Sequence, residues 1–141
     1  MRGSAPKKPT TVLIVENEGI VRLELTAQFM EMGLVVLSAD NADEAIALLD
    51  AHAEIRLLFT DIKMPGSMDG VRLAAHVRHR WPPVKIIVAS GFAGTPLSDL
   101  PDDTIFLSKP YGPGAIAGAL RAHRINIRNP EPSGGRPRLR A

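Results

Sequence analysis

The chain has no cysteine, so its 141 residues supply neither a disulfide nor a thiolate metal ligand. It has no apolar run approaching the roughly 18 residues that a membrane-spanning helix needs. The basic first residues lead directly into the short run Val12–Val15, without the apolar core or small-residue cleavage site of a signal peptide. These absences exclude a disulfide scaffold and a membrane protein, and we expect a cytoplasmic location.

The composition is ordinary for one soluble globular domain, with 45% hydrophobic and 23% charged residues. Residues 10–120 hold eight basic and fourteen acidic side chains, whereas the two ends hold nine basic side chains and one acidic one. The basic pI of the whole chain therefore reflects the charges of its two ends and not those of residues 10–120. We predict a flexible basic leader over residues 1–9, a folded domain over 10–124, and a disordered tail rich in Pro, Gly and Arg over 125–141. The basic ends favour a complete protein over a piece of a hybrid kinase.

Short β-branched runs alternate with helical patterns between the ends. Five nearly continuous apolar runs predict strands buried on both faces of a parallel sheet: Thr11–Val15, Leu34–Ser38, Arg56–Thr60, Val84–Ala89 and Thr104–Leu107. Helical patterns cover Glu18–Met32, Ala42–Ala53, Asp69–Arg80 and Gly112–Arg124, whereas the proline-containing stretch around Thr95–Leu100 predicts one turn or an ordered loop. This alternation indicates an α/β three-layer sandwich with right-handed crossovers.

Apolar residues at helical spacing predict the buried face of each helix. The stripes are Ile20, Leu23, Ala27 and Met30, then Val71, Ala74 and Val77, then Ile116, Ala119 and Leu120. Gly33 stands where the residue after the first helix is expected. Asn41 is the expected N-cap of the second helix, with Glu44 three residues further on.

Polar residues follow the predicted strands at the edge where parallel strands end together and ligands collect. They are Glu16 and Asn17 after the first strand, Asp61 after the third, Ser90 after the fourth, and Ser108 and Lys109 after the fifth. Asp40 follows the second strand, whose place at the sheet margin would hold it away. An aspartate can attack phosphorus, an ammonium and an oxygen-bound cation can neutralise the phosphoryl group, and a hydroxyl can donate to it.

Five separated motifs extend this pattern along residues 10–124: Val12–Glu18 (VLIVENE), Asp61–Pro65 (DIKMP), Asp69-Gly70, Ala89–Gly91 and Lys109–Tyr111. With them the chain resembles the CheY-like response-regulator receiver domains of bacterial two-component systems, as a single-domain response regulator. The resemblance implies a flavodoxin-like, doubly wound, five-stranded parallel sheet in the order 2-1-3-4-5.

The resemblance also implies a phosphorelay function. Asp61 would take a phosphoryl group from a histidine kinase or a histidine phosphotransfer protein, with Mg²⁺ (or Mn²⁺) bound. The implied metal ligands are Glu16, Asn17, Asp61 and the backbone carbonyl of Lys63. The implied ammonium is Lys109, and the implied switch pair is Ser90 and Phe106. The Lys109–Pro110 bond matches a position that is commonly cis in the family, and the sequence leaves the isomer open.

Phosphorylation would then reshape a face made of the segment around 95–100, the strand at 104–107 and the helix at 112–124, which the resemblance implies is the output face. Because the sequence shows no output domain, the signal is expected to pass to a downstream protein partner or to a further relay step. We expect no membrane partner and no enzymatic activity beyond self-phosphorylation from small phosphodonors and self-dephosphorylation. Homodimerisation stays open.

Two departures from the family pattern affect the site. Asn17 stands where the family usually has Asp, which predicts weak Mg²⁺ binding that Glu16 or Glu18 would partly offset. The loop Met64–Gly70 is one residue longer than the commonest pattern and lies beside Asp61. Lys63 and Phe92 occupy positions that influence hydrolysis of the phosphoryl group in the family.

Several alternatives stay open at this level. A pseudo-receiver that acts as an interaction scaffold would suit Asn17. A phosphatase of the haloacid-dehalogenase type would need an acid where Lys63 stands, and nucleic-acid binding by the Arg-rich end lacks aromatic residues and a helical pattern. Three of the candidate site residues also have a purely structural interpretation: Ser90 as a turn residue, Phe106 as a core residue and Asn17 as a helix N-cap. His76 and His79 suggest a solvated face, and His52 and His123 suit helix C-termini.

Overall fold

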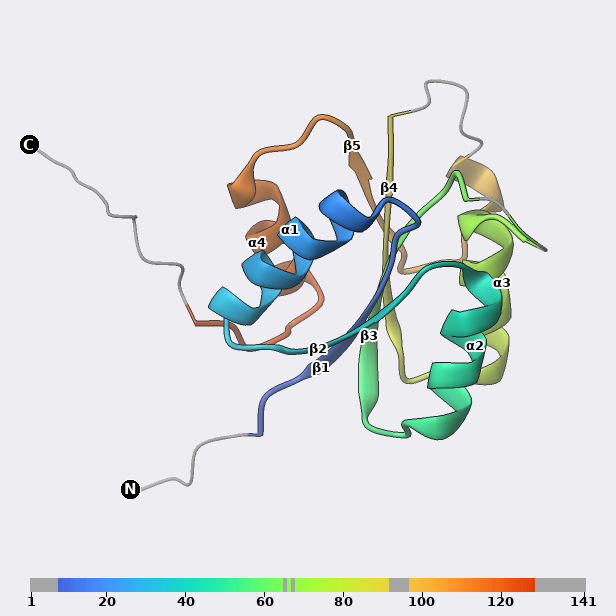
Figure 1. The fold of residues 1–141 in the computed structure, drawn as a ribbon, viewed down its shortest axis with the longest axis horizontal. Coiled ribbons are helices and arrows are strands. Elements are labelled where there is room, and N and C mark those ends of the chain that lie inside the picture. The colour runs from blue at the N-terminus through green and yellow to red at the C-terminus, as the bar shows by residue number, and fades with distance from the viewer. Residues whose placement is uncertain (1–7, 65, 67, 92–96, 129–141) are drawn as a thin grey trace, which may run out of the picture.

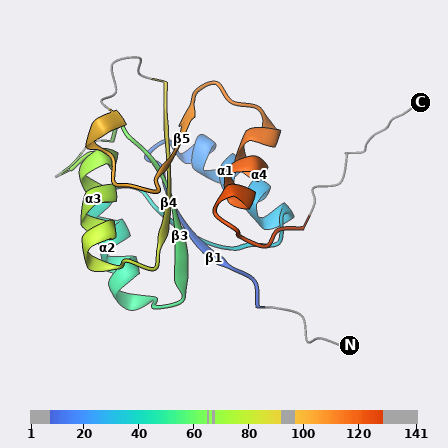
Figure 2. The same cartoon turned by 180° about the vertical axis from the view of Figure 1, so that it is seen from behind.

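The computed structural model describes residues 8–64, 66, 68–91 and 97–128. A five-stranded parallel sheet runs in the order β2-β1-β3-β4-β5, as predicted. Its strands are β1 (Thr11–Val15), β2 (Val35–Ala39), β3 (Ile55–Asp61), β4 (Lys85–Ser90) and β5 (Ile105–Ser108). The helices are α1 (Gly19–Glu31), α2 (Ala42–Ala51), α3 (Gly70–Arg80) and α4 (Pro113–Ala122). Figures 1 and 2 show α1 and α4 on one face of the sheet and α2 and α3 on the other.

The stretch between β4 and β5 contains only one short helical element within the described residues, the 3-10 turn η1 (Leu97–Asp99). The described part thus forms one turn, which is one of the two alternatives predicted for this stretch. Residues 92–96, which include Phe92, lie outside the described residues. The α4 of this structure is therefore the helix that the receiver pattern counts as its fifth.

Two apolar cores lie on opposite faces of the sheet. Leu13 and Val15 of β1 point into the core beneath α2 and α3, whereas Val12 and Ile14 point into the core beneath α1 and α4. Strands β3 and β4 alternate in the same way, which explains their continuous apolar runs. The margin strands differ from the prediction, because the residues of β5 are only partly buried or exposed and β2 buries Ala39 alone. A margin strand lacks a neighbouring strand on one side. The prediction that both faces are buried is therefore wrong for β2 and β5.

The predicted buried stripe of α1 is also wrong. Ile20, Leu23 and Met30 are 77%, 71% and 58% exposed, and the helix buries Leu25 and Phe29 instead. Ala27 is exposed with the stripe. Both sets of residues have helical spacing, and the phenylalanine set packs against Phe59 of the sheet with ring centroids 5.3 Å apart. The stripes of α3 and α4 face the cores as predicted: Ala74, Val77, Ile116, Ala119 and Leu120 are buried. Val71 is partly buried and packs against the core beneath α2 and α3.

The helix ends follow local capping rules. Asn41 caps α2 by accepting a 2.9 Å hydrogen bond from the Glu44 amide, as predicted. Helix α1 ends in a Schellman motif, in which the Gly33 and Leu34 amides donate to the carbonyls of Met30 and Phe29. Gly33 has φ 92°, which confirms its predicted position just after the helix.

Helix α4 ends in the same motif with a different residue. The Arg124 and Ile125 amides donate to the carbonyls of Arg121 and Leu120, and Arg124 has φ 62°. The chain then continues as an ordered strap over residues 125–128, in which Ile125 and Ile127 pack on the core beneath α1 and α4. The Arg128 amide donates to the Met32 carbonyl at 2.7 Å, so the strap reaches the end of α1 (Figure 2). The predicted start of a disordered tail at residue 125 was therefore too early.

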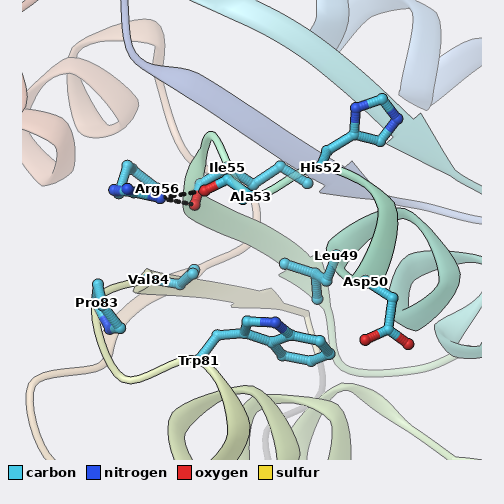
Figure 3. Close-up of a pocket in the computed structure, with 9 residues that line it drawn as sticks. All are labelled: Leu49, Asp50, His52, Ala53, Ile55, Arg56, Trp81, Pro83 and Val84. Carbon is cyan, nitrogen blue, oxygen red and sulfur yellow. Dashed lines mark hydrogen bonds between the residues drawn. The ribbon is translucent and has the colours of Figure 1, made fainter.

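Trp81 ends α3 and packs against the core beneath α2 and α3. Beside it is a cavity of about 260 Å³ that lies between α2, the beginning of β3 and the turn into β4 (Figure 3). The strands begin at this edge of the sheet, so the cavity lies opposite the predicted phosphorylation edge. Within the described residues, no helix combines the length and apolarity that crossing a membrane requires.

Candidate phosphoacceptor site

The carboxyl ends of β1, β3 and β5 bring three charged side chains together. The Lys109 ammonium donates to the Asp61 carboxylate, with Nζ and Oδ2 2.9 Å apart. The same Nζ lies 4.0 Å from Oε1 of Glu16. The three residues are separated by up to 93 positions in the chain, yet they form one site at the predicted edge.

Glu16 is the buried acid of this site, with a relative exposure of 2%. Its Oε2 accepts a 3.0 Å hydrogen bond from the Glu18 amide, which fixes the turn after β1. Burial raises the pKa of the Glu16 carboxyl, the Glu18 amide opposes that shift, and the nearby charge of Asp61 adds to it. The site therefore holds two close carboxylates that attract a cation.

Lys109 supplies the positive charge between them. Burial alone would lower its pKa, but the hydrogen bond and charge of Asp61 and the charge of Glu16 outweigh burial and raise it. Its amide donates to the Ser90 carbonyl at 2.9 Å, and the bond that follows, Lys109–Pro110, is cis. The structure thus settles the isomer that the sequence left open.

Backbone contacts hold Asp61 at the end of β3. The Ile62 amide donates to the Ala89 carbonyl, and the Gly70 amide donates to the Ile62 carbonyl at 2.8 Å. Helix α3 begins so close to β3 that a Cβ on Gly70 would overlap the Asp61 carbonyl oxygen and come within 2.8 Å of the Ile62 Cα. The Asp-Gly motif therefore has a steric reason that sequence analysis missed: no side chain fits at residue 70.

Ser90 and Phe106 lie where the prediction placed them, but their switch roles stay predictions. Ser90 is buried at the end of β4, next to Gly91 and level with Ser108 in the sheet. Phe106 is half-buried and packs on the edge of the core beneath α2 and α3. Core packing accounts for the position of Phe106 in this conformation.

Asn17 is exposed, and α1 begins after Glu18 without a side-chain cap, so the alternative of Asn17 as the N-cap is wrong. Among the described residues, no three His, Cys, Asp or Glu side chains gather closely enough to hold a metal ion. The oxygen donors at the edge are therefore the carboxylates of Glu16 and Asp61, the Asn17 amide and backbone carbonyls. This set fits a hard cation such as Mg²⁺, which keeps several waters, but with less negative charge than three acids would give.

A neighbouring ion pair was missed by sequence analysis. Nη1 of Arg22 in α1 donates to the Glu16 backbone carbonyl at 2.7 Å and to Oδ1 of Asp40 at 3.0 Å. Asp40 was expected to lie too far away to matter at the site. It contacts the site indirectly, through Arg22, because α1 crosses from β1 towards β2.

The histidines differ from expectation in two cases. His123 is buried, and its ring Nε2–H donates to the Ile86 carbonyl at 2.9 Å, so it is no solvated cation at a helix end. His76 is half-buried, with its ring centroid 5.9 Å from that of Trp81, whereas His79 is exposed as predicted. Lys63 is exposed two residues beyond Asp61, and Pro65 and Ser67 of the predicted long loop lie outside the described residues.

The family model of the response regulator receiver domain matches residues 12–121. The chain belongs to this family. The response regulator receiver protein CpdR of Brucella abortus is 36% identical to this receiver domain over 103 residues, which cover 71% of this chain and 84% of that protein. The sensor kinase CckA of the same organism is 31% identical over 115 residues, but these cover 79% of this chain and only 12% of the kinase.

Solved structures agree with the receiver fold. A response regulator receiver protein from Sinorhizobium medicae superimposes with a TM-score of 0.75 at 27% identity, covering 81% of this chain and 93% of that chain. The response regulator TrrA of Thermotoga maritima, solved in complex with Mg²⁺ and BeF, has a TM-score of 0.69 at 22% identity over 79% of this chain and 96% of its own. The five-stranded order and the placement of the helices are therefore those of a receiver domain.

Proposed function

We propose that this receiver domain accepts a phosphoryl group on Asp61 within a two-component phosphorelay. The observation that carries the proposal is the 2.9 Å contact between the Lys109 ammonium and the Asp61 carboxylate, with the buried Glu16 carboxylate beside them. Asp61 is the carboxylate bonded to the ammonium, and its side chain is 13% exposed, so a donor can reach it. The proposed location is the cytoplasm.

The chemistry is an in-line transfer from a phosphohistidine. A carboxylate oxygen of Asp61 forms a bond to phosphorus while the P–N bond of the donor breaks, and its electron pair returns to the imidazole nitrogen. Glu16, Asn17, Asp61 and the Lys63 carbonyl would hold a divalent cation, which supplies positive charge to the phosphoryl oxygens. Lys109 pairs with the new negative charge, and the Ser90 hydroxyl reorients to donate to a phosphoryl oxygen.

The output follows from the same contacts. Movement of Ser90 and Lys109 towards the phosphoryl group draws in the β4 end and the Lys109–Pro110 turn, and Phe106 rotates inward beside them. The altered face comprises η1, β5 and α4 and contacts a downstream protein partner. Any catalysis is limited to self-phosphorylation from small phosphodonors and self-dephosphorylation.

The test is incubation with acetyl phosphate and Mg²⁺, followed by intact-mass measurement. The wild-type chain gains the mass of one phosphoryl group, and Asp61→Ala gains none. Asp69→Ala is a matched control, because Asp69 is an exposed aspartate that caps α3 and does not contact Lys109. An unlabelled wild type, or label that persists in Asp61→Ala, would contradict the proposal.

The exposed stripe of α1, formed by Ile20, Leu23, Ala27 and Met30, is the proposed contact for the histidine-bearing partner. Its 3-4-3 spacing is that of a coiled-coil seam. Glu24 and Glu31 flank it, so a helix with basic flanks complements it. A groove of about 420 Å³ lined by Val21, Lys109, Pro110 and Tyr111 continues from α1 to the phosphoacceptor edge. A helix bundle on this face would present its histidine to Asp61.

This contact is tested by Leu23→Lys, which places a cation in the seam. The rate of transfer from a phosphorylated histidine partner should fall at least tenfold, whereas labelling by acetyl phosphate stays unchanged. Val35→Lys is the control, since Val35 is an exposed apolar residue at the β2 margin. Equal loss from both donors would assign Leu23 to folding and refute the docking face.

The second candidate is a pseudo-receiver that acts as an interaction scaffold. Asn17, with no third acid near Glu16 and Asp61 among the described residues, favours it. Calorimetric titration with MgCl₂ and MnCl₂ separates the two functions. A dissociation constant in the millimolar range supports the phosphoacceptor, and Asn17→Asp should tighten it. Absence of binding by wild type together with absence of labelling supports the scaffold.

A further inference from the structure

Arg22 connects the acidic turn after β1 to the end of β2. The two hydrogens of its Nη1 go to different partners, the Glu16 backbone carbonyl at 2.7 Å and the Asp40 carboxylate at 3.0 Å. The first bond acts on the peptide that joins Glu16 to Asn17. Both residues flanking that peptide belong to the site, so its orientation determines where their side chains point.

Asp40 is itself held in place. Its amide donates to Oε1 of Glu44 at 2.8 Å, and the Glu44 amide donates to the Asn41 side chain at the start of α2. The α2 cap therefore fixes Asp40, Asp40 orients the Arg22 guanidinium, and Arg22 holds the Glu16 carbonyl. On the other side of the turn, the Glu18 amide donates to the Glu16 carboxylate. The turn is thus fixed from both ends.

We propose that Arg22 is a positioning residue of the phosphoacceptor site: by holding the Glu16–Asn17 peptide, it keeps the Glu16 carboxylate and the Asn17 amide directed at a divalent cation beside Asp61. This inference rests on the proposed function. Positioning by Arg22 matters more here than it would in a site with three acids. Asn17 contributes a dipole and no charge, and a dipole binds a cation only when it is correctly oriented.

The sign of the charge effect makes the proposal testable. Arg22 carries a positive charge near a cation site, so removing it would strengthen Mg²⁺ binding if charge alone mattered. A positioning role predicts the opposite. Groups that orient metal ligands from outside typically contribute about 10–100-fold in metal affinity. We therefore expect Arg22→Met to weaken Mg²⁺ binding about tenfold, and Arg22→Lys, which keeps donors, to restore part of it.

Two controls accompany the calorimetric titration with MgCl₂. Arg80→Met breaks a comparable exposed ion pair, with Nη2 and Oδ1 of Asp50 2.7 Å apart, at the opposite edge of the sheet, and should leave Mg²⁺ affinity unchanged. Asp40→Asn removes one negative charge but keeps an acceptor for Arg22. If Arg22 acts by positioning, this substitution should change the Mg²⁺ affinity by less than about threefold. If charge alone matters, Asp40→Asn weakens binding and Arg22→Met strengthens it.

A metal-free measurement completes the test. Hydrogen exchange of the Glu18 amide reports on its bond to the Glu16 carboxylate, and Arg22→Met should speed this exchange while the thermal melting temperature stays within a few degrees. Arg80→Met should not. Unchanged Glu18 exchange together with unchanged or stronger Mg²⁺ binding in Arg22→Met would overturn the positioning role. A wild-type chain that neither binds Mg²⁺ nor is labelled on Asp61 would instead overturn the proposed function and, with it, this inference.

Discussion

Gly70 is the residue where the site and the fold constrain each other most tightly. Replacing a glycine by alanine inside a helix ordinarily stabilises a protein by about 0.5–1 kcal/mol. At residue 70 the added Cβ would overlap the Asp61 carbonyl, so α3 or β3 must move. We expect Gly70→Ala to lower the free energy of unfolding by about 1–3 kcal/mol and to reduce labelling of Asp61. Urea denaturation and acetyl phosphate labelling check both effects.

The control for that substitution lies in α4. Gly118 is an exposed helical glycine, and beyond its chain neighbours and the backbone of its own helix a Cβ there would meet no atom within 4 Å. Gly118→Ala should therefore stabilise the chain by about 0.5–1 kcal/mol and leave labelling unchanged. A Gly70→Ala variant as stable as Gly118→Ala would show that the helix start has room to move.

His123 makes stability depend on pH. Burial lowers the pKa of His123 below the ordinary value of 6.5, and the bond to the Ile86 carbonyl opposes that shift. The nearby charges of Lys85 and Arg78 lower the pKa further, whereas the charge of Asp103 raises it. Between the lowered pKa and 6.5 the unfolded chain binds more protons than the folded chain, so stability falls as pH falls through this window. Above the window the contribution is fully present. Unfolding free energies at pH 7.5 and 5.5 should differ less in His123→Gln than in wild type, because glutamine can donate to Ile86 without titrating. Equal differences in the two proteins would count against His123.

Helices α1 and α4 end in the same capping motif, but its left-handed position is a glycine in α1 and an arginine in α4. Gly33 and Arg124 both adopt positive φ, at 92° and 62°, after their helices. The left-handed conformation costs a non-glycine residue roughly 1–2 kcal/mol. Arg124→Gly should therefore stabilise the chain by about 1 kcal/mol in urea denaturation, whereas Gly33→Ala should destabilise it by a similar amount. Destabilisation by Arg124→Gly would indicate that the arginine side chain contributes more than the strain costs.

Element existence was predictable from the sequence, and the orientation of elements was predictable only in part. Strands β1, β3 and β4 have continuous apolar runs because both of their faces are buried, and this pattern identified the parallel sheet. Helix α1 carries two apolar sets at helical spacing, so periodicity alone did not decide which set faces the sheet. The answer depends on Phe29 packing against Phe59, a contact across 30 positions in the chain. Arg22 and His123 escaped prediction for the same reason, since the fold brings Arg22 close to Asp40 and His123 close to the Ile86 carbonyl.

At the scale of the whole molecule, the strap over residues 125–128 closes the core beneath α1 and α4. Ile125 and Ile127 pack on that core, and the Arg128 amide bonds to the Met32 carbonyl. Ending the chain after Arg124 instead of after Arg128 should lower the free energy of unfolding by about 1–3 kcal/mol, as expected for losing two partly buried isoleucines. Urea denaturation of the two truncated chains measures the difference. Equal midpoints would mean that the strap only covers the surface.

The grouping of the candidate site residues at one edge was predictable at this scale because a parallel sheet gathers all its carboxyl ends. Three strand ends that are distant in sequence supply Glu16, Asp61 and Lys109, and the order β2-β1-β3-β4-β5 places β1 and β4 on either side of β3. What the strand order did not reveal is the support around these residues: the missing side chain at Gly70 and the Arg22 bridge to Asp40. Both depend on distances of a few ångströms between elements.

The contact between Arg128 and Met32 also determines where an attached protein would sit. Helix α1 starts beside the acidic turn and runs away from it, so its end lies towards the edge where the strands begin (Figure 1). Met32 caps that end and bonds to Arg128, which places the strap there as well. A fluorescent reporter joined directly after Arg128 would therefore be tethered on the side remote from Asp61. Such a fusion leaves the candidate site accessible and suits a test of the proposed phosphorylation in solution.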